Sequence, residues 1–252
     1  MRIGIIGAGT IGKTIIRDLQ RRGDVAIDFV LVRETARADW LDLPAATFIS
    51  DEAEALARGV DLIIETAMPE LVARLAPRAL EHSDFCAFSG TALADAAVER
   101  AIRDAAAASG RRFFVPHGAV MALDGLEDGR ELLQSVTITT TKSGKSLGLD
   151  LDAQGLVFEG TAREACKRFP RNVNVHAAIA LAGIGLDRTV SRIVAVPGQQ
   201  ENEHRIEIRG EGLEWNLEIA SRSLGGVTGS YTPHSAAGSV RRILGGSGIR
   251  MA

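Results

Sequence analysis

The sequence predicts an α/β protein with an N-terminal Rossmann-type, doubly wound parallel sheet and a second α+β domain whose sheet is mainly antiparallel. Three observations support this. Over residues 1–120, short runs of β-branched residues alternate with helical patterns, as in βαβ units. The segment GAGTIG at residues 7–12 follows the first of these runs and opens the first helical pattern. After residue 120, alternating segments such as SVTITTT replace the continuous apolar runs, as in a sheet with one face in water.

Strands and helices are expected to alternate through residues 1–120. Strands are expected at residues 3–6, 25–32, 47–49, 61–66, 85–89 and 112–116, and helices at residues 11–22, 51–58, 69–82 and 92–109. The strand segments are nearly continuous apolar runs, because helices cover both faces of a parallel sheet. Residues 1–120 are therefore predicted to form a dinucleotide-binding domain of doubly wound architecture.

Residues 121–230 are predicted to form a domain for substrate binding, catalysis and oligomerisation. Its strands are expected at residues 135–141, 193–195, 204–209 and 213–219, with one helix at residues 171–186 between them. The last segment, residues 231–252, contains a helical pattern at residues 233–244 and is expected to pack back on the first domain.

Length and composition exclude several classes of protein. At about 100–200 residues per domain, a chain of 252 residues makes one large or two small domains. Lys and Arg number 29 against 32 Asp and Glu, and aromatic residues make up 4%, so a nucleic-acid binder with a basic surface and stacking rings is not expected. No apolar run reaches the roughly 18–20 residues of a membrane span.

The cysteines and the first residues bear on metal binding and location. Cys86 and Cys166 belong to no CxxC motif or histidine-rich cluster, so no metal site is expected and both are predicted to be reduced core thiols. Met1 and Arg2 lead directly into the first strand segment rather than into a leader pattern. A cytoplasmic protein is the expectation.

The segment at residues 7–12 predicts a phosphate cradle. Gly7 suits a tight turn, Gly9 lets the backbone approach a pyrophosphate, and Gly12 allows close packing of helix on strand. Thr10 and Ile11 lie in the first helical turn, where backbone N–H groups face a bound phosphate. Because the motif lies between a predicted strand and a predicted helix, NAD or NADP binding is expected.

Residues at the ends of later strands are expected to contact the rest of the dinucleotide. Arg33 suits a 2′-phosphate and the adjacent Glu34 suits a 2′-hydroxyl, so the choice between NADP and NAD stays open. Ala67, after the strand at residues 61–66, and the segment at residues 89–91 are expected near the nicotinamide half.

Histidine is the natural candidate for proton transfer near neutral pH, and the chain has five. His82 is expected on the surface at the end of a helix. The others follow a strand, begin a helix, begin a strand or precede the last helix, namely His117, His176, His204 and His234. Position alone does not choose among these four.

A long block in the second half resembles the L-aspartate dehydrogenase family. It reads FEGTAREACKRFPRNVNVHAAIALAGIGLDRTVSRIVAV and is followed by ENEHRIEI, and the resemblance extends to GAGTIG and VPHGAVMALDGL. The resemblance implies reversible, NAD(P)-dependent oxidative deamination of L-aspartate, linked to NAD biosynthesis. It places the catalytic histidine on His204, the asparagine that contacts nicotinamide on Asn174, and a backbone contact on Ala119.

The chain also departs from the family pattern around the expected substrate pocket. His117 stands in place of a serine, Met121 and Ala122 in place of two glycines, and His176 in place of a small residue. Arg205 follows the catalytic histidine instead of a glutamate, and Pro233-His234-Ser235-Ala236 replaces a PKTS-like motif. These departures leave the exact amino acid open.

A dicarboxylic substrate needs cations and hydroxyl or amide donors. The candidates are Lys142, Arg163, Arg171, Thr232 and Ser235. Two alternatives remain: an NAD(P)-dependent dehydrogenase or imine reductase for a different amino acid, and a non-catalytic dinucleotide sensor. A homodimer is expected by analogy and not from a particular residue, and the open face of the second sheet is a surface that a partner subunit could cover.

Overall fold

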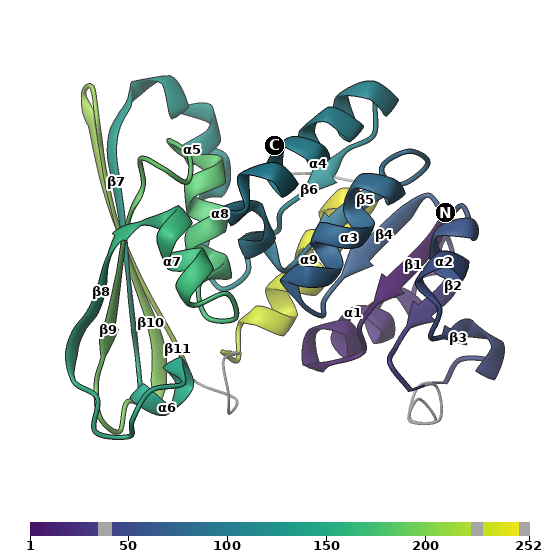
Figure 1. Ribbon diagram of the computed structural model, residues 1–252, viewed down its shortest axis with the longest axis horizontal. Coiled ribbons are helices and arrows are strands. Elements are labelled where there is room, and N and C mark those ends of the chain that lie inside the picture. Colours follow the sequence, from purple (N-terminus) through teal and green to yellow (C-terminus); the bar gives the residue numbers. More distant parts are fainter. Residues whose placement is uncertain (35–41, 223–228, 247–252) are drawn as a thin grey trace.

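Two sheets lie side by side with helices between them (Figure 1). The computed structural model describes residues 1–34, 42–222 and 229–246. The first sheet has six strands in the order β3-β2-β1-β4-β5-β6, and the second has five in the order β11-β10-β7-β9-β8. The predicted fold class, a Rossmann-type parallel sheet followed by an α+β region, is confirmed.

Each strand pair of the first sheet is parallel. Its strands are β1 (Arg2–Ile6), β2 (Ala26–Leu31), β3 (Phe48–Ile49), β4 (Leu62–Glu65), β5 (Asp84–Ala87) and β6 (Phe113–Phe114). The strand order reverses between β1 and β4, which opens a crevice at the carboxyl ends of these strands. This reversal determines where a dinucleotide would bind.

The helices of the first half alternate with its strands. They are α1 (Thr10–Gln20), α2 (Glu52–Ala57), α3 (Pro69–Ala79) and α4 (Ala96–Ser109). The single helix expected at residues 92–109 is wrong, because a 3₁₀ segment, Gly90–Ala94, precedes α4. The Asp95 carboxylate accepts a hydrogen bond of 2.8 Å from the Ala97 N–H and so starts a new helix.

The second sheet is mixed, with one parallel pair, β7 with β9, and three antiparallel pairs. Its strands are β7 (Leu133–Lys142), β8 (Gly155–Thr161), β9 (Val190–Ala195), β10 (Glu201–Gly210) and β11 (Leu213–Arg222). The sequence did not predict β8. Its burial does not alternate and its register shifts between Leu156 and Phe158, so it lacks the period of two that marks a half-buried strand.

Helices cover the face of the second sheet that is turned toward the first sheet (Figure 1). They are α5 (Leu123–Asp128), α7 (Ala162–Arg168) and α8 (Asn174–Ala182), and the short α6 (Gly144–Leu147) lies at one end of the sheet. The expected helix at residues 171–186 is therefore shorter and begins at Asn174. Helix α7 was not predicted, although Thr161 and Glu164 form a capping box at its start.

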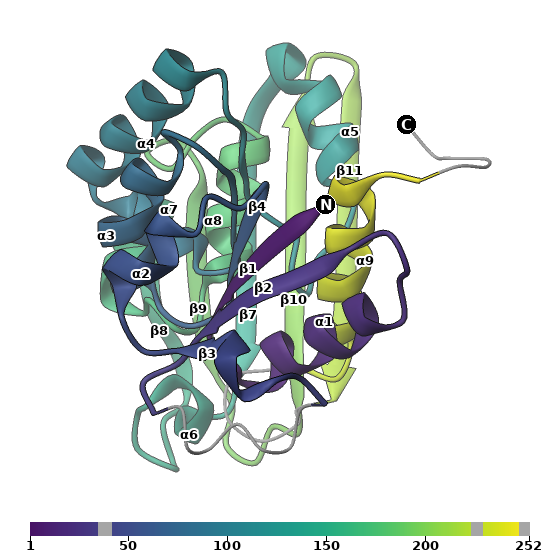
Figure 2. The same cartoon turned by 90° about the vertical axis from the view of Figure 1, so that its right-hand side faces the viewer.

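The last helix, α9 (Thr232–Leu244), lies beside α1 and returns the chain to the first sheet (Figure 2). Ala236 and Val240 are buried in the same apolar cluster as Ile15 of α1. Arg241 adds an ion pair of 2.9 Å to Asp18. This packing brings residues 229–232 to the gap between the two sheets.

The two cysteines are buried and unpaired, as predicted for core thiols. Among the helices that the structure describes, none has the length and apolar character needed to cross a membrane. In the same described part of the chain, no group of three or more His, Cys, Asp or Glu side chains is arranged to hold a metal ion.

Candidate active site

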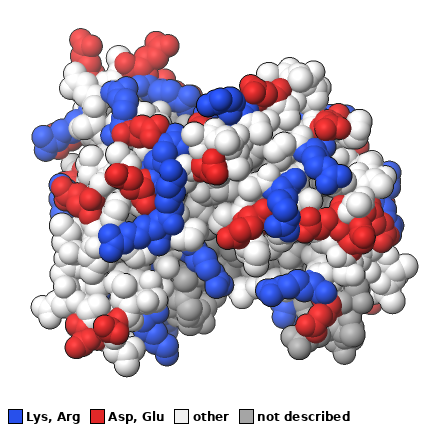
Figure 3. Space-filling view, in the orientation of Figure 1, with Lys and Arg blue, Asp and Glu red and all other residues white. Residues whose placement is uncertain are grey.

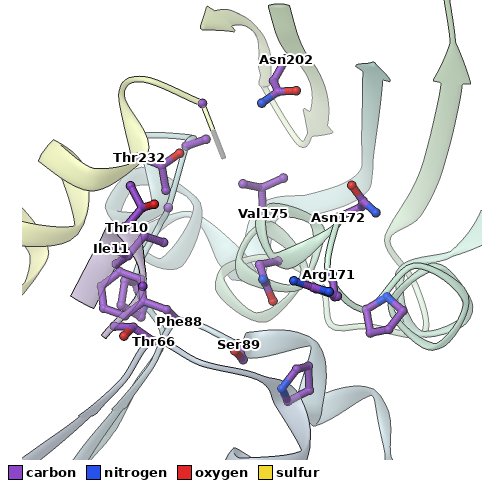
Figure 4. Close-up of a pocket in the computed structure, with 18 of the residues that line it drawn as sticks. Thr10, Ile11, Thr66, Phe88, Ser89, Arg171, Asn172, Val175, Asn202 and Thr232 are labelled. Atoms are coloured by element: carbon purple, nitrogen blue, oxygen red, sulfur yellow. The ribbon is translucent and has the colours of Figure 1, made fainter. Parts of the chain in front are cut away.

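A cavity of about 320 Å³ lies between the two sheets (Figure 4). It brings together residues from the first sheet, from α8, from the second sheet and from the start of α9. The predicted site residues that line it are Gly9, Thr10, Ile11, Ala67, Ala119, Lys142, Asn174, His204 and Thr232. Segments far apart in the sequence thus converge on one site.

A second cavity, of about 570 Å³, adjoins the first at the carboxyl ends of the first-sheet strands. Both are lined by Gly9, Thr66, Ala67 and Arg171. Arg33 and Glu34 line only the second cavity, as expected for residues near an adenosine ribose. Together the two cavities make an elongated site that suits an extended dinucleotide.

The glycine-rich turn has the geometry that a pyrophosphate requires. Gly7 has a φ of +91°, and a Cβ on Gly12 would lie 2.4 Å from the Gly7 carbonyl oxygen. By contrast, a Cβ on Gly9 would meet nothing within 4 Å, so the space above Gly9 is open. Among the residues that the structure describes, no side chain caps the start of α1, which leaves its first N–H groups for an anion. The residues present therefore fit a dinucleotide phosphate.

This geometry predicts an effect of Gly9→Ala that is confined to the ligand. The new methyl group meets no protein atom, so the free energy of unfolding should change by no more than about 1 kcal/mol. Because the methyl group would occupy the space of the phosphate, NAD(P)H affinity should fall by about tenfold or more. Titration of cofactor fluorescence measures the affinity. Gly23→Ala, also open but distant from the cavities, is the matched control, and equal affinities of the two variants would contradict the cradle.

His204 lies on β10 with its ring at the wall of the cavity. Its side chain is 3% exposed, and its Nδ1 lies 2.8 Å from the Thr140 hydroxyl, which leaves Nε2 for the cavity. Burial, followed by the nearby Lys142 ammonium, lowers the pKa of His204 to about 3. The imidazole is therefore neutral at pH 7, the state that a general base requires.

Lys142, the last residue of β7, is the buried cation of the cavity. Its ammonium lies 3.5 Å from the Asn172 carbonyl oxygen, and burial lowers its pKa to about 8. Among the described residues that line this cavity, Lys142 and Arg171 bear formal charges and both are cationic. The cavity thus suits an anionic substrate.

The positive charge is local. On the face seen in Figure 3, Lys and Arg side chains are interspersed with Asp and Glu. The whole chain has a formal net charge of −3. An anionic ligand is therefore attracted by the helix start and by individual cations in the cavities rather than by a field from the whole surface.

Asn174 is held in a fixed orientation at the start of α8. Its Oδ1 accepts a hydrogen bond from the Thr91 N–H at 3.3 Å and lies 3.1 Å from the Thr91 hydroxyl, which is also 2.8 Å from the Pro170 carbonyl oxygen. Nδ2 therefore remains the part of the side chain that can donate to a ligand. Thr91 belongs to the segment at residues 89–91 that was expected near the nicotinamide, and Ser89 of that segment lines the cavity.

Two candidates for substrate binding do not line the cavity. The Arg163 guanidinium forms ion pairs with Glu99 at 3.0 Å and with Asp187 at 2.5 Å. The Ser235 hydroxyl donates to the Gly118 carbonyl oxygen behind the cavity wall. Neither of these two side chains lines the cavity, whereas Arg171 does.

The residues that depart from the family pattern do not line this cavity. His117 and Met121 line a different hollow beside α9, and His234 is exposed outside the described cavities. The His117 Nδ1–H donates to the Val120 carbonyl oxygen at 2.6 Å, so this residue shapes its loop. His176 is fully buried and does not line the cavity.

Several residues at the site were not predicted. Thr66, Asn172 and Asn202 line the cavity beside the predicted residues. Glu65, fully buried at the end of β4, accepts hydrogen bonds from the Ala67 N–H at 2.6 Å and from the Ser89 hydroxyl at 2.8 Å. Burial raises its pKa to about 7. A glutamate that ends an apolar run of a parallel strand was the signal that could have identified it.

Known proteins match the chain along most of its length. Residues 7–116 match the homoserine dehydrogenase NAD binding domain family, and residues 124–243 match the aspartate dehydrogenase C-terminal family. An L-aspartate dehydrogenase of Bordetella pertussis is 35% identical over 99% of this chain and 97% of its own, and one from Methanopyrus kandleri is 30% identical over 100% and 98%.

A solved structure agrees with these sequence matches. Aspartate dehydrogenase from Thermotoga maritima superposes with a TM-score of 0.75 at 28% identity and covers 97% of this chain and 95% of its own. The agreement therefore includes both sheets. The resemblance inferred from the sequence is confirmed, and the chain belongs to the aspartate dehydrogenase family.

Proposed function

We propose that the protein catalyses the reversible, NAD(P)-dependent oxidative deamination of L-aspartate. The product, iminoaspartate, hydrolyses to oxaloacetate and ammonia. The observation that carries this proposal is the presence in one cavity of a neutral imidazole, His204, and a buried ammonium, Lys142, next to a dinucleotide cradle. When bound, NAD(P)+ supplies the acceptor for the hydride that leaves the substrate Cα.

His204 is proposed as the acid and base of the reaction. Its neutral Nε2 takes one proton, either from the substrate ammonium before hydride transfer or from the water that attacks the imine. A pKa of about 3 makes His204 a weak base in the protein without substrate, because burial and Lys142 both disfavour the imidazolium. A bound carboxylate near Lys142 offsets that positive charge, so substrate binding itself raises the pKa of His204.

The cationic and polar lining suits the two carboxylates of aspartate. Lys142 and Arg171 offer charge, while Thr232 and Asn202 offer a hydroxyl and an amide. Figure 4 shows Arg171, Asn202 and Thr232 placed around the same cavity; they come from the turn before α8, from β10 and from the start of α9. A substrate that lacks one carboxylate would forgo a charge-assisted contact with a cation of this cavity, so it should bind more weakly.

A panel of amino acids tests the substrate. The kcat/KM for L-aspartate should exceed that for L-asparagine and L-alanine by about 100-fold or more, because each lacks one carboxylate. Faster turnover of another amino acid would favour the alternative dehydrogenase. Tight NAD(P)H binding with no turnover of any amino or imino acid would instead favour the sensor.

Arg33 is proposed to select between the two cofactors. The Arg33→Gln variant should lose affinity for NADPH by about tenfold, since a charge-assisted hydrogen bond to a phosphate contributes about 1.5–3 kcal/mol. Its affinity for NADH should change by less than about threefold. Titration of both cofactors against the wild type measures this, and an equal loss for both would assign Arg33 a role other than 2′-phosphate binding.

A homodimer located in the cytoplasm is the remaining part of the proposal. The face of the second sheet away from the helices has no helix on it in Figure 1. That face contains the partly exposed Thr137, Thr139, Thr141 and Val194. Sedimentation velocity tests the dimer, and a monomer at micromolar concentration would contradict it.

A further inference from the structure

His204 is the first of four buried side chains that form a hydrogen-bonded chain. The His204 Nδ1 is 2.8 Å from the Thr140 hydroxyl, which is 2.6 Å from the His176 Nε2. The His176 Nδ1 is in turn 2.5 Å from the Ser191 hydroxyl. His204 is 3% exposed and the other three are fully buried.

The four side chains come from four different elements that pack together. Thr140 of β7 and His204 of β10 are direct cross-strand partners, and Ser191 lies on β9, which pairs with the other edge of β7. His176 reaches them from α8, which covers this face of the sheet. The chain therefore connects the cavity wall with the interior of the second half.

A second buried imidazole, His176, lies behind the cavity wall. Burying a second imidazole here is costly unless both ring nitrogens find partners, and both do. Because His176 does not line the cavity, its hydrogen-bonded connection to His204 passes through Thr140.

The number of available protons limits how the hydrogen bonds of these four side chains can be directed. Burial lowers the pKa of both imidazoles, and Lys142 lowers both further, so each ring is neutral and carries one N–H. The Thr140 hydroxyl has one proton to donate. In one consistent arrangement, the His204 Nδ1–H donates to Thr140, the Thr140 hydroxyl donates to the His176 Nε2, and the His176 Nδ1–H donates to Ser191. The opposite arrangement puts the His204 proton on Nε2, where it would block a base.

We propose that His176 and Thr140 are positioning residues that hold His204 as its Nδ1–H tautomer, with the Nε2 lone pair facing the substrate. When Nε2 takes a proton, the Nδ1–H of the imidazolium keeps its acceptor on Thr140, and that bond strengthens. No hydrogen bond of the chain has to break. This inference rests on the proposed acid and base role of His204.

Variants of Thr140 test the proposal. Thr140→Val keeps the shape and removes the hydroxyl, and Thr140→Ser keeps the hydroxyl. Thr140→Val should lower kcat by about 10–100-fold, the usual effect of losing an orienting partner. KM for aspartate and the affinity for NAD(P)H should change by less than about threefold. Thr140→Ser should stay within about threefold of the wild type.

Two further variants complete the set. His176→Ala should lower kcat in the same direction with KM unchanged. Ser83→Ala is the control, because Ser83 is a buried hydroxyl bonded at 2.6 Å to the Val60 carbonyl oxygen away from the site. Its kcat should equal that of the wild type.

Nitrogen-15 NMR of the wild-type protein tests the tautomer without any folding risk. The His204 signals, assigned by their loss in His204→Gln, should show a protonated Nδ1 and an unprotonated Nε2. A protonated Nε2 in the neutral ring would overturn the proposal.

The kinetic outcomes separate this inference from the proposed function. If His204→Gln loses activity while Thr140→Val and His176→Ala turn over like the wild type, the positioning role of Thr140 and His176 is overturned. The proposed function then stands. If His204→Gln turns over like the wild type, the acid and base role of His204 is wrong. The positioning role of Thr140 and His176 is then wrong as well.

Discussion

Replacing His204 with glutamine is expected to lower kcat for aspartate oxidation by about 10²–10⁴-fold, the usual contribution of a general acid or base. Glutamine keeps a polar side chain of similar length at the cavity wall but cannot take up a proton at neutral pH. Stopped-flow and steady-state measurements of NAD(P)H formation at pH 7–9 would give kcat and KM separately.

The loss should be confined to chemistry. The affinity for NAD(P)H should stay within about threefold of the wild type, since the glycine-rich cradle lies on the other sheet. A variant that binds cofactor normally and retains full turnover would exclude His204 from the acid and base role. His82→Gln is the matched control, because His82 is an exposed histidine remote from both cavities.

The second large effect is expected for Lys142→Met, which keeps most of the length of the side chain and removes its charge. KM for aspartate should rise by about 100-fold, because removing one member of a buried charge pair costs about 2–5 kcal/mol. Lys145→Met is the control, since Lys145 is exposed and does not line the cavity. Equal KM values for the two variants would contradict the role of Lys142.

The pH dependence of the same residue has a defined sign. Burial lowers the pKa of Lys142 to about 8, so the ammonium is present below pH 8 and is lost above it. KM for aspartate in the wild-type enzyme should therefore rise as the pH passes 8. Lys142→Met should show no such rise.

The charge of Lys142 favours the binding of aspartate but should lower the stability of the ligand-free protein. The folded protein binds fewer protons at Lys142 than the unfolded chain between pH 8 and 10.5, so the ammonium destabilises the ligand-free fold at neutral pH. Lys142→Met should increase the free energy of unfolding at pH 7 by about 1–3 kcal/mol. Thermal melting of both proteins without ligand measures this.

The strands of the first sheet could be predicted from the sequence because both faces of this sheet are covered. Strands covered on both faces, such as Leu62–Glu65, consist of continuous apolar residues and are easily found in a sequence. β8 was missed for the opposite reason, since neither of its faces is fully buried and its residues follow no period. The capping box at Thr161 and Glu164 could have identified α7, because it marks a helix start.

The cradle followed from the sequence, whereas the cavity as a whole did not. Asn174 and His204 lie on a helix and on a strand of different layers, and spacing along the chain does not show that they meet. Their pairing came from the resemblance to a family. Thr140 and Asn202 lie two residues from Lys142 and His204 on strands, so the period of two places each pair on one face. This period of two could have identified Thr140 and Asn202 as residues at or near the site.

His176 was expected at the edge of the substrate pocket and instead lies behind the site. Sequence reasoning placed it correctly near the start of a helix but could not tell which side of the helix faces the second sheet. Helix α8 is apolar all around because it is packed between two layers. Its sequence pattern therefore does not show which side of the helix faces the second sheet.

The measurement that tests the central claim most directly follows nitrogen from ammonium into the product. The wild-type protein is incubated with oxaloacetate, nitrogen-15 ammonium and NADH or NADPH, and the products are identified by NMR. The account predicts nitrogen-15 L-aspartate in amounts equal to the NAD(P)H consumed. Consumption of NAD(P)H with formation of the 2-hydroxy acid, or binding of NAD(P)H without consumption, would contradict it.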